Sequence, residues 1–128
     1  APEKVTMPRE PTASPEQFIQ GAPVLQVQDV LATAAFYRDV LGFDWDFGDE
    51  EYCVVWRDNS AIHFARGDGD VSGLHLFQWV RDVDALHEEV TAKGAVVAVE
   101  LASRSYGVRD FKITDPNGVG LVFGQAID

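Results

Sequence analysis

The hydrophobic pattern from residue 21 onward predicts one strand, one helix and then three further strands. The helix is expected over residues 30–41, which carry apolar groups at helical spacing: Ala32, Ala35, Phe36 and Val40. Asp29 is placed to accept the free N–H groups of its first turn, and Gly42 is placed to end it. The strands are expected where short β-type runs occur, at residues 23–27, 45–47, 52–57 and 60–65, with a hairpin turn at Asp58 and Asn59.

The same order of elements begins again after a polar, glycine-rich link at residues 66–73. A second helix is expected over residues 83–93, capped by Asp82 and ended by Gly94, with apolar groups on one face: Val83, Leu86 and Val90. The strands of this half are expected at residues 74–80, 95–99, 109–114 and 120–124. A turn at Asp115-Pro116-Asn117-Gly118 joins the last two of them.

This repeat predicts an α+β fold of two tandem βαβββ modules, at about residues 21–66 and 73–126 of a single domain that spans 21–128. Neither half buries its sheet alone, so the two are expected to form one curved mixed sheet, a cup with the helices on its outer face. Residues 1–20 hold four of the 6 prolines and few apolar groups. They are predicted to be an extended arm or a disordered tail.

The charge of the chain narrows the possible partners. Its 10 basic and 21 acidic residues give a formal net charge of -11, which disfavours binding to nucleic acids and to anionic membrane surfaces. The same charge would attract a cationic ligand, although solubility alone also explains it. No apolar run suits a membrane span, and no signal-peptide pattern is present. The single cysteine, Cys53, excludes an internal disulfide, and the expected compartment is the cytoplasm.

Several segments resemble one protein family. The segment VQDVLATAAFYRDVLGF resembles the first-module signature of the vicinal oxygen chelate superfamily. The segment HLFQWVRDVDAL resembles the start of that superfamily's second module, and DPNG resembles its terminal hairpin. The superfamily includes glyoxalase I, fosfomycin-resistance enzymes, extradiol dioxygenases and bleomycin-resistance proteins. The resemblance covers residues 22–124 and implies the same cup-shaped fold.

The resemblance also locates the positions at which metal-using members bind their ion. These positions correspond here to Ala22, His75 and Val122, with a further position near His63. Alanine and valine have no donor atom, and His75 with His63 as an uncertain second ligand would hold a divalent ion only weakly. His75 is therefore interpreted as a cup-lining side chain. No metal or other cofactor is expected.

The metal-free bleomycin-resistance proteins are the branch that this chain resembles most, in its APVL, GFDWDF and YGVRDFKITDPNG segments. They are acidic, and they sequester a cationic drug in a crevice between two subunits of a dimer. The resemblance therefore implies a homodimer that binds a cationic aromatic ligand or a bleomycin-type antibiotic without turnover.

Alternation along the strands, anchored on Ala22, His75 and Val122, divides the side chains between two faces. Tyr52 is placed in the cup by the resemblance to the resistance proteins, and Trp56 then follows by alternation. The cup is expected to carry an aromatic-rich ligand-binding set: Gln26, Trp45, Phe47, Tyr52, Trp56, His75, Phe77, Trp79, Tyr106, Asp110 and Lys112. Such rings suit stacking on a flat ligand and attract cations. The opposite faces, which include Leu25, Val27, Ile62, Phe64, Leu76 and Val80, are expected to pack on the helices. Gln78 interrupts that apolar run, and His87 is expected to face solvent.

Three functions remain open. The first is sequestration of a small molecule. The second is a metal-dependent lyase or oxygenase that uses His75 and His63, or a metal-free enzyme with His75 as general base, alone or with Asp110. The third is a dimeric module whose cup binds a partner protein or has no resistance role at all.

Overall fold

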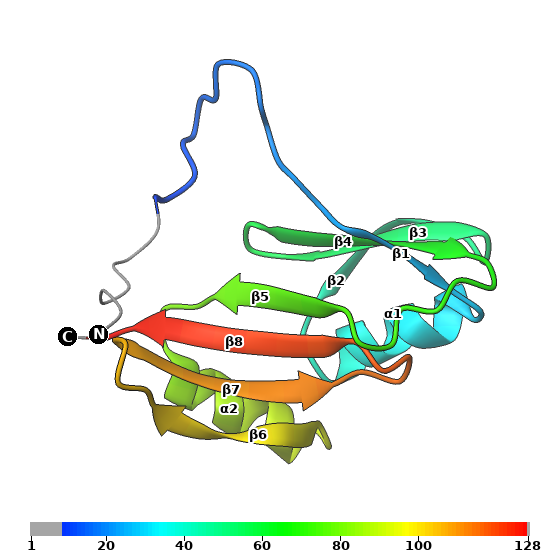
Figure 1. Ribbon diagram of the computed structural model, residues 1–128. Helices are drawn as coiled ribbons and strands as arrows, with labels where there is room; N and C mark the ends of the chain where they lie inside the picture. The colour runs from blue at the N-terminus through cyan, green and yellow to red at the C-terminus, as the bar shows by residue number, and fades with distance from the viewer. Residues whose placement is uncertain (1–8, 128) are drawn as a thin grey trace. The chain divides into compact units, whose positions relative to one another are not determined.

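The computed structural model describes residues 9–127, which form an α+β fold of two βαβββ modules (Figure 1). The predicted fold class is confirmed. The chain divides into two compact units, one of residues 10–71 and one of residues 72–127 together with Arg9. Positions 1–8 of the predicted N-terminal arm lie outside the described residues. Positions 9–20 contain neither helix nor strand, and their side chains are exposed.

The first unit is a four-stranded mixed sheet with one helix. Its elements are β1 (Val24–Val27), α1 (Val30–Asp39), β2 (Asp44–Gly48), β3 (Tyr52–Arg57) and β4 (Ser60–Arg66). The strand order is β1-β4-β3-β2, in which β1 and β4 run parallel and the other neighbours antiparallel. Helix α1 lies on one face of this sheet, which is the face that contributes the buried side chains of Leu25, Ile62 and Phe64.

Helix α1 begins as predicted, but a different face of it is buried. The Asp29 carboxylate accepts a hydrogen bond from the Ala32 backbone N–H at 3.0 Å. The buried residues are Val30, Thr33, Ala34 and Tyr37, so the prediction that Ala32, Ala35, Phe36 and Val40 form the apolar stripe is wrong. Tyr37 occupies the buried side of α1, where its ring packs against Phe43 and Phe64 with centroids 5.8 Å and 5.0 Å apart.

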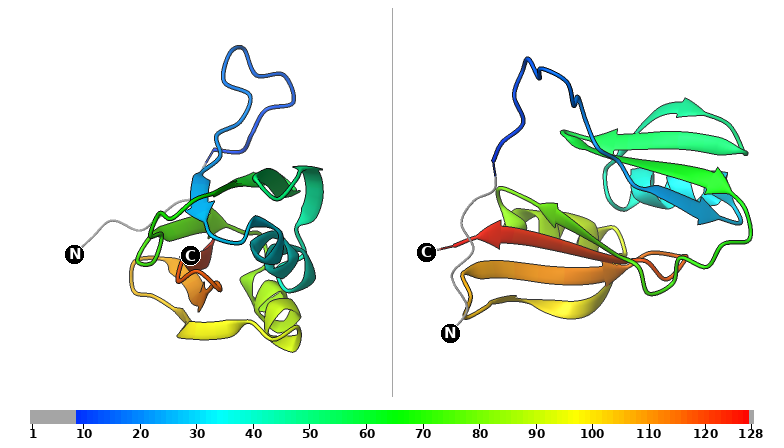
Figure 2. Two further views of the ribbon diagram at one scale, coloured as in Figure 1. Left: turned by 90° about the vertical axis from the view of Figure 1, so that its right-hand side faces the viewer. Right: turned by 45° about the horizontal axis from the view of Figure 1, so that its top comes forward.

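The second unit repeats this topology. Its elements are β5 (His75–Trp79), α2 (Val83–Ala92), β6 (Val96–Ser103), β7 (Val108–Thr114) and β8 (Gly120–Ala126). The strand order is β5-β8-β7-β6, again with one parallel pair, β5 with β8. Figures 1 and 2 show α2 along one face of this sheet. Phe111, Ile113, Leu121 and Phe123 are buried on that face.

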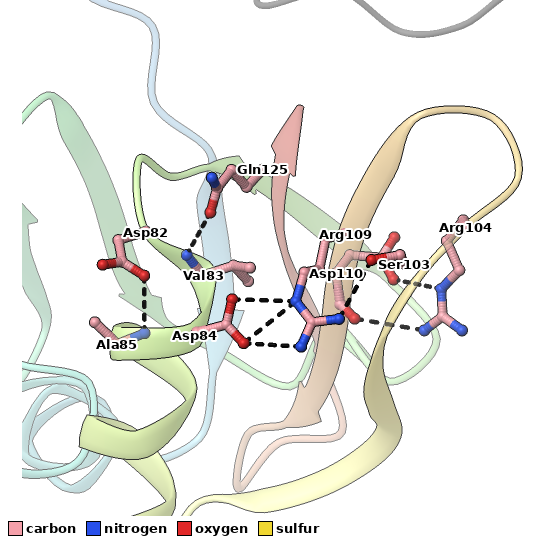
Figure 3. A network of polar contacts seen from close by, with 9 residues as sticks. All are labelled: Asp82, Val83, Asp84, Ala85, Ser103, Arg104, Arg109, Asp110 and Gln125. Carbon is pink, nitrogen blue, oxygen red and sulfur yellow. Dashed lines mark hydrogen bonds and ion pairs between the residues drawn. The ribbon is translucent and has the colours of Figure 1, made fainter. Parts of the chain in front are cut away.

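One side chain caps the start of α2, and three others attach it to the sheet (Figure 3). Asp82 accepts from the Ala85 N–H at 3.0 Å, and the Gln125 side chain accepts from the Val83 N–H at 2.9 Å. The Arg109 guanidinium binds both carboxylate oxygens of Asp84, with Nη2 and Oδ1 2.8 Å apart. The first N–H groups of the helix therefore have acceptors, and β7 is tied to its first turn.

His87 of α2 does not face solvent as expected. Its ring makes an edge contact with Phe111, with centroids 4.9 Å apart, and its Nε2 atom is buried without a hydrogen-bond partner among the described residues. Residue 87 lies on the side of the helix that packs toward β7. The spacing of Val83, Leu86 and Val90 did not show whether residue 87 would face the sheet or the solvent.

The DPNG segment forms the predicted turn between β7 and β8. The Asp115 side chain is buried, and its Oδ1 accepts from the backbone N–H groups of Asn117 at 2.8 Å and of Val119 at 2.9 Å. Gly118 has a φ of 84°, a left-handed conformation that glycine adopts without strain. This turn sets the register of β8, and therefore which side of the sheet each of its side chains faces. None of the described helices is long and apolar enough to cross a membrane.

Candidate functional site

The face of the second sheet away from α2 carries the densest group of predicted site residues. Its register aligns Phe77 with Val122 and Lys112 in one row, and Trp79 with Gly124 and Asp110 in the next. Side chains paired across neighbouring strands point to the same side of a sheet. We call the surface of these residues, with His75 and Gly120, the open face. Gln78 is paired with buried Phe123 on the other side, so the alternation of β5 does not slip at this residue.

Phe77 and Trp79 form an aromatic pair on the open face. Their ring centroids are 4.7 Å apart with an interplanar angle of 63°, and the two side chains remain 47% and 37% exposed. The Phe77 ring lies over Gly124, since its Cζ atom is 2.6 Å from the position that a Cβ of residue 124 would occupy. Glycine at this position therefore makes room for the ring on the surface of β8.

A second glycine supports the polar end of the open face. The position that a Cβ of Gly120 would occupy is 2.6 Å from Lys112 Cε, 3.2 Å from Lys112 Nζ and 3.1 Å from His75 Nδ1. The Lys112 side chain therefore crosses β8 from its own strand, β7, toward His75 on β5. These two nitrogen-bearing groups converge on one point, two residues along β8 from Val122.

Asp110 is on the open face, but its charge is already compensated. Its Oδ1 accepts from Arg104 Nε at 2.9 Å (Figure 3). Arg104 also donates to the backbone carbonyl of Glu100 at 3.0 Å. Asp110 is buried as a result. Tyr106, another predicted site residue, is exposed in the turn between β6 and β7, two residues before Val108, whose side chain lies beside Gly124.

The first sheet has its own exposed aromatic face. Its register pairs Tyr52 with Ala65, Trp56 with Ala61 and Phe47 with Val54. These three aromatic residues are exposed, and the Tyr52 hydroxyl is 2.5 Å from His63 Nδ1. Gln26 is on the same side, where its amide packs against the link at Gly67 and Gly69.

Trp45 is the one predicted site residue of β2 that the register places on the other face. It pairs with Val55, which is fully buried on the side of α1, whereas Phe47 pairs with Val54. A register shift between Trp45 and Phe47 inserts one residue, so plain alternation gives the two the same side and the bulge separates them. The structure therefore does not bring Trp45 together with Phe47, Tyr52 and Trp56.

Within the described part of the chain, the donor atoms at the family's metal positions do not fit a divalent ion. Among residues 9–127 no group of three or more His, Cys, Asp or Glu side chains could hold a metal. Ala22 and Val122 offer no donor, and the Lys112 ammonium adjoins His75. A metal site needs several lone pairs directed at one point, and a neighbouring ammonium opposes a cation there.

Some residues that shape the site were not found from the sequence. Arg104 neutralises Asp110, and Gly120 and Gly124 hold the groups above β8. The two glycines had a detectable signal, since glycine within a strand often marks a close approach by another group. Arg104 had none, because its ion pair depends on how the β6–β7 hairpin closes.

Comparison with known proteins gives both family and structural matches. Residues 10–128 match the model of a family described as glyoxalase superfamily protein. The chain is similar to the bleomycin-binding protein from bleomycin-producing Streptomyces verticillus, solved with copper(II)-bleomycin. The two are 30% identical with a TM-score of 0.73, over 88% of this chain and 98% of that one.

Two further solved structures share the fold. A bleomycin-binding protein complexed with bleomycin is 22% identical, with a TM-score of 0.71 over 83% of this chain and 97% of that one. TioX from Micromonospora sp. ML1 is 19% identical, with a TM-score of 0.75 over 84% of this chain and 98% of that one. A search of curated protein sequences finds no significant match.

Proposed function

The chain belongs to the glyoxalase superfamily, and from this premise we propose that it is a small-molecule binding protein. In this proposal it sequesters a cationic aromatic or bleomycin-type antibiotic, without a metal ion and without turnover. The ligand lies against the open face of the second sheet, where Phe77 and Trp79 are its main contacts.

The observation that carries the proposal is the exposed Phe77–Trp79 pair above Gly124. Large apolar rings left in water are costly unless a ligand or partner covers them. A planar ring system gains contact area on such a pair, and a cationic one also gains from the negative faces of the rings. A glycine floor beneath the ring is consistent with a shaped surface rather than a random exposed residue.

The relatives and the charge support the ligand class. One structure 30% identical to this chain is described as a bleomycin-binding protein in complex with copper(II)-bleomycin. The net charge of -11 would raise the local concentration of a positively charged molecule. A steered encounter of this kind weakens as salt is added, because the Debye length falls.

The proposal extends to the exposed side chains of the first sheet and to a dimer. On the exposed face of the first sheet the further proposed ligand contacts are Tyr52, Trp56, Phe47 and Gln26. In the second unit Tyr106 is a further proposed contact. A homodimer follows from the bleomycin-resistance resemblance, and the exposed aromatic faces supply apolar surface that a subunit interface would bury. Sedimentation equilibrium tests the dimer: a single species of monomer mass at micromolar concentration would contradict that part.

The competing function is a metal-dependent lyase or oxygenase centred on His75 and His63. Two features argue against it: Ala22 and Val122 carry no donor atom, and the Lys112 ammonium converges with His75. Elemental analysis of the purified protein separates the two functions. Stoichiometric zinc, manganese, iron or nickel that disappears in His75→Ala would favour the enzyme.

The binding proposal is tested by titrating metal-free bleomycin into three proteins: the unaltered chain, Trp79→Ala and Trp45→Ala. Both variants remove one tryptophan, but the register places only Trp79 on the open face. Calorimetry is expected to show binding that Trp79→Ala weakens by about 2 kcal/mol or more and Trp45→Ala leaves nearly unchanged. Equal affinities in the unaltered chain and Trp79→Ala would overturn the proposal. Recovery of unaltered bleomycin from the complex is the check on turnover.

A further inference from the structure

We propose that Lys112, with His75 beside it, forms a subsite on the open face for a carboxylate group of the aromatic ligand. This inference rests on the proposed function, because it assumes that a ring lies against Phe77 and Trp79. It adds the ligand class: an aromatic molecule with a carboxylate at the end away from those rings, whatever positive charge it carries elsewhere.

The first observation is where Lys112 points. Its side chain does not extend from β7 into solvent but lies across β8, with Cε and Nζ 2.6 Å and 3.2 Å from the Cβ position of Gly120. His75 Nδ1 is 3.1 Å from the same position. An ammonium and an imidazole nitrogen therefore converge on one small area, where both can donate a hydrogen bond to one anionic oxygen pair.

The second observation is that Lys112 has no partner within residues 9–127. No hydrogen bond or ion pair joins it to another described group, and the carboxylate of Asp110 on the same strand is held by Arg104. Other cations of the chain do have acidic partners, among them Arg38 with Asp39, Arg66 with Glu51 and Arg109 with Asp84. In a chain with 21 acidic and 10 basic residues, an unpaired lysine on the ligand-facing side is available to a ligand.

The spacing of the two glycines sets the length of the ligand. Lys112 lies over Gly120 and the Phe77 ring over Gly124. Four residues of a strand span about 13 Å, with Val122 as the apolar floor between them. A two-ring acid that lies along β8 can contact Phe77 at one end and Lys112 at the other, whereas a single-ring acid is shorter than this span.

The net charge of the chain and the charge of this subsite act at different ranges. The acidic surface attracts a molecule with net positive charge from a distance, and that attraction is screened by salt. Lys112 acts only in contact, where it selects the orientation in which a carboxylate meets the ammonium. We therefore expect a ligand, or part of a ligand, in which a carboxylate and an aromatic system are separated by about the distance between Gly120 and Gly124.

The test uses biphenyl-4-carboxylate and biphenyl-4-carboxamide, which differ in charge but hardly in shape, and measures both dissociation constants by calorimetry. The unaltered chain is expected to bind the acid about tenfold more tightly than the amide, as one charge-assisted hydrogen bond would give. Lys112→Met keeps the aliphatic cover over Gly120 and should abolish this preference, and Lys112→Arg should restore most of it. Lys93→Met is the matched control: Lys93 lies at the end of α2 and pairs with Glu89, so the preference should persist.

The outcomes separate the subsite from the proposed function. If acid and amide bind equally, with both lost in Trp79→Ala, the aromatic site stands and the carboxylate subsite is wrong. If the preference survives in Lys112→Met, another group holds the carboxylate and the inference is also wrong. Failure of both probes and of bleomycin to bind would refute the subsite and the binding function together.

Discussion

The Phe77 ring lies directly over Gly124, with its Cζ atom 2.6 Å from where a Cβ on that residue would stand. This contact joins the sequence of β8 to the shape of the candidate site. Any side chain at residue 124 must displace the ring, and the ring is half of the aromatic pair with Trp79. Gly124 is thus a positioning residue for a surface that it does not itself present to a ligand.

Gly124→Ala is therefore expected to weaken bleomycin binding while the protein still folds. The new methyl group would meet Phe77 Cζ at 2.6 Å and Val108 Cγ1 at 3.1 Å, so the exposed ring has to move. A tilt of that ring should cost roughly 0.5–1.5 kcal/mol of affinity, which is the range for aromatic contacts. Gly21→Ala is the control, because nothing lies within 4 Å of its Cβ position. Unchanged calorimetric affinity in Gly124→Ala would contradict the role assigned to Phe77.

The Asp115 turn should account for a measurable part of the stability. Asp115→Ala leaves the N–H groups of Asn117 and Val119 without their carboxylate acceptor, and the hydrogen bond to Val119 is buried. The expected loss in the free energy of unfolding is about 2–4 kcal/mol, measured by urea denaturation. Asp115→Asn keeps an oxygen acceptor and should lose less. An equal loss of unfolding free energy in the two variants would contradict the stabilising role of the side-chain oxygen acceptor at residue 115.

The Arg109–Asp84 pair predicts a pH-dependent contribution to stability. Hydrogen bonding to the Arg109 guanidinium lowers the pKa of Asp84 below its ordinary value of 3.8. A lowered pKa in the folded state means that this stabilisation is complete above the ordinary value and is lost as the pH falls through the lowered one. The pair is at the surface, so the effect is small and sensitive to salt.

The measurement compares the unaltered protein with Asp84→Asn at neutral pH and at pH values below the ordinary carboxyl range. The stability advantage of the unaltered protein should shrink on acidification. In an Arg109→Gln background the same substitution should have little effect at either pH. An advantage that stays constant on acidification, or persists without Arg109, would contradict this assignment.

Cys53 is predicted to be an unreactive thiol in the folded protein. Burial raises its pKa, and the charge of Asp49 raises it further, so the thiolate that reacts with electrophiles is scarce at neutral pH. The side chain is also fully buried in β3. A thiol reagent such as Ellman's should label it slowly in the native state and rapidly in guanidinium chloride. Equally fast labelling in both states would mean that β3 opens readily.

The sequence predicted much of the fold because strong local signals agreed. Asp29 and Asp82 both cap the helices as expected, and the DPNG segment forms the expected turn. The buried face of α1 was predicted wrongly, because nearly every residue of that helix is apolar or small and spacing alone did not rank them. Tyr37, which is fully buried, packs against Phe43 and Phe64.

The candidate site was less predictable, because its details depend on register and on contacts between strands. Alternation placed Phe77, Trp79, Asp110 and Lys112 on one side, as the strand pairing has them. It could not locate the bulge that separates Trp45 from Phe47. Alternation also could not show that Arg104 forms an ion pair with Asp110 or that the Lys112 side chain crosses β8. Both contacts join side chains that meet only after the sheet forms.

The central claim is that a ligand is held on the open face of the second sheet, and backbone amide mapping tests it most directly. Proton–nitrogen correlation spectra of labelled protein would be recorded as unlabelled, metal-free bleomycin is added. The largest shifts are predicted at Phe77, Trp79 and Gly124, including the Trp79 indole N–H, with α2 little changed. Shifts concentrated on α1 or α2, or no shifts at all with excess bleomycin, would contradict the account.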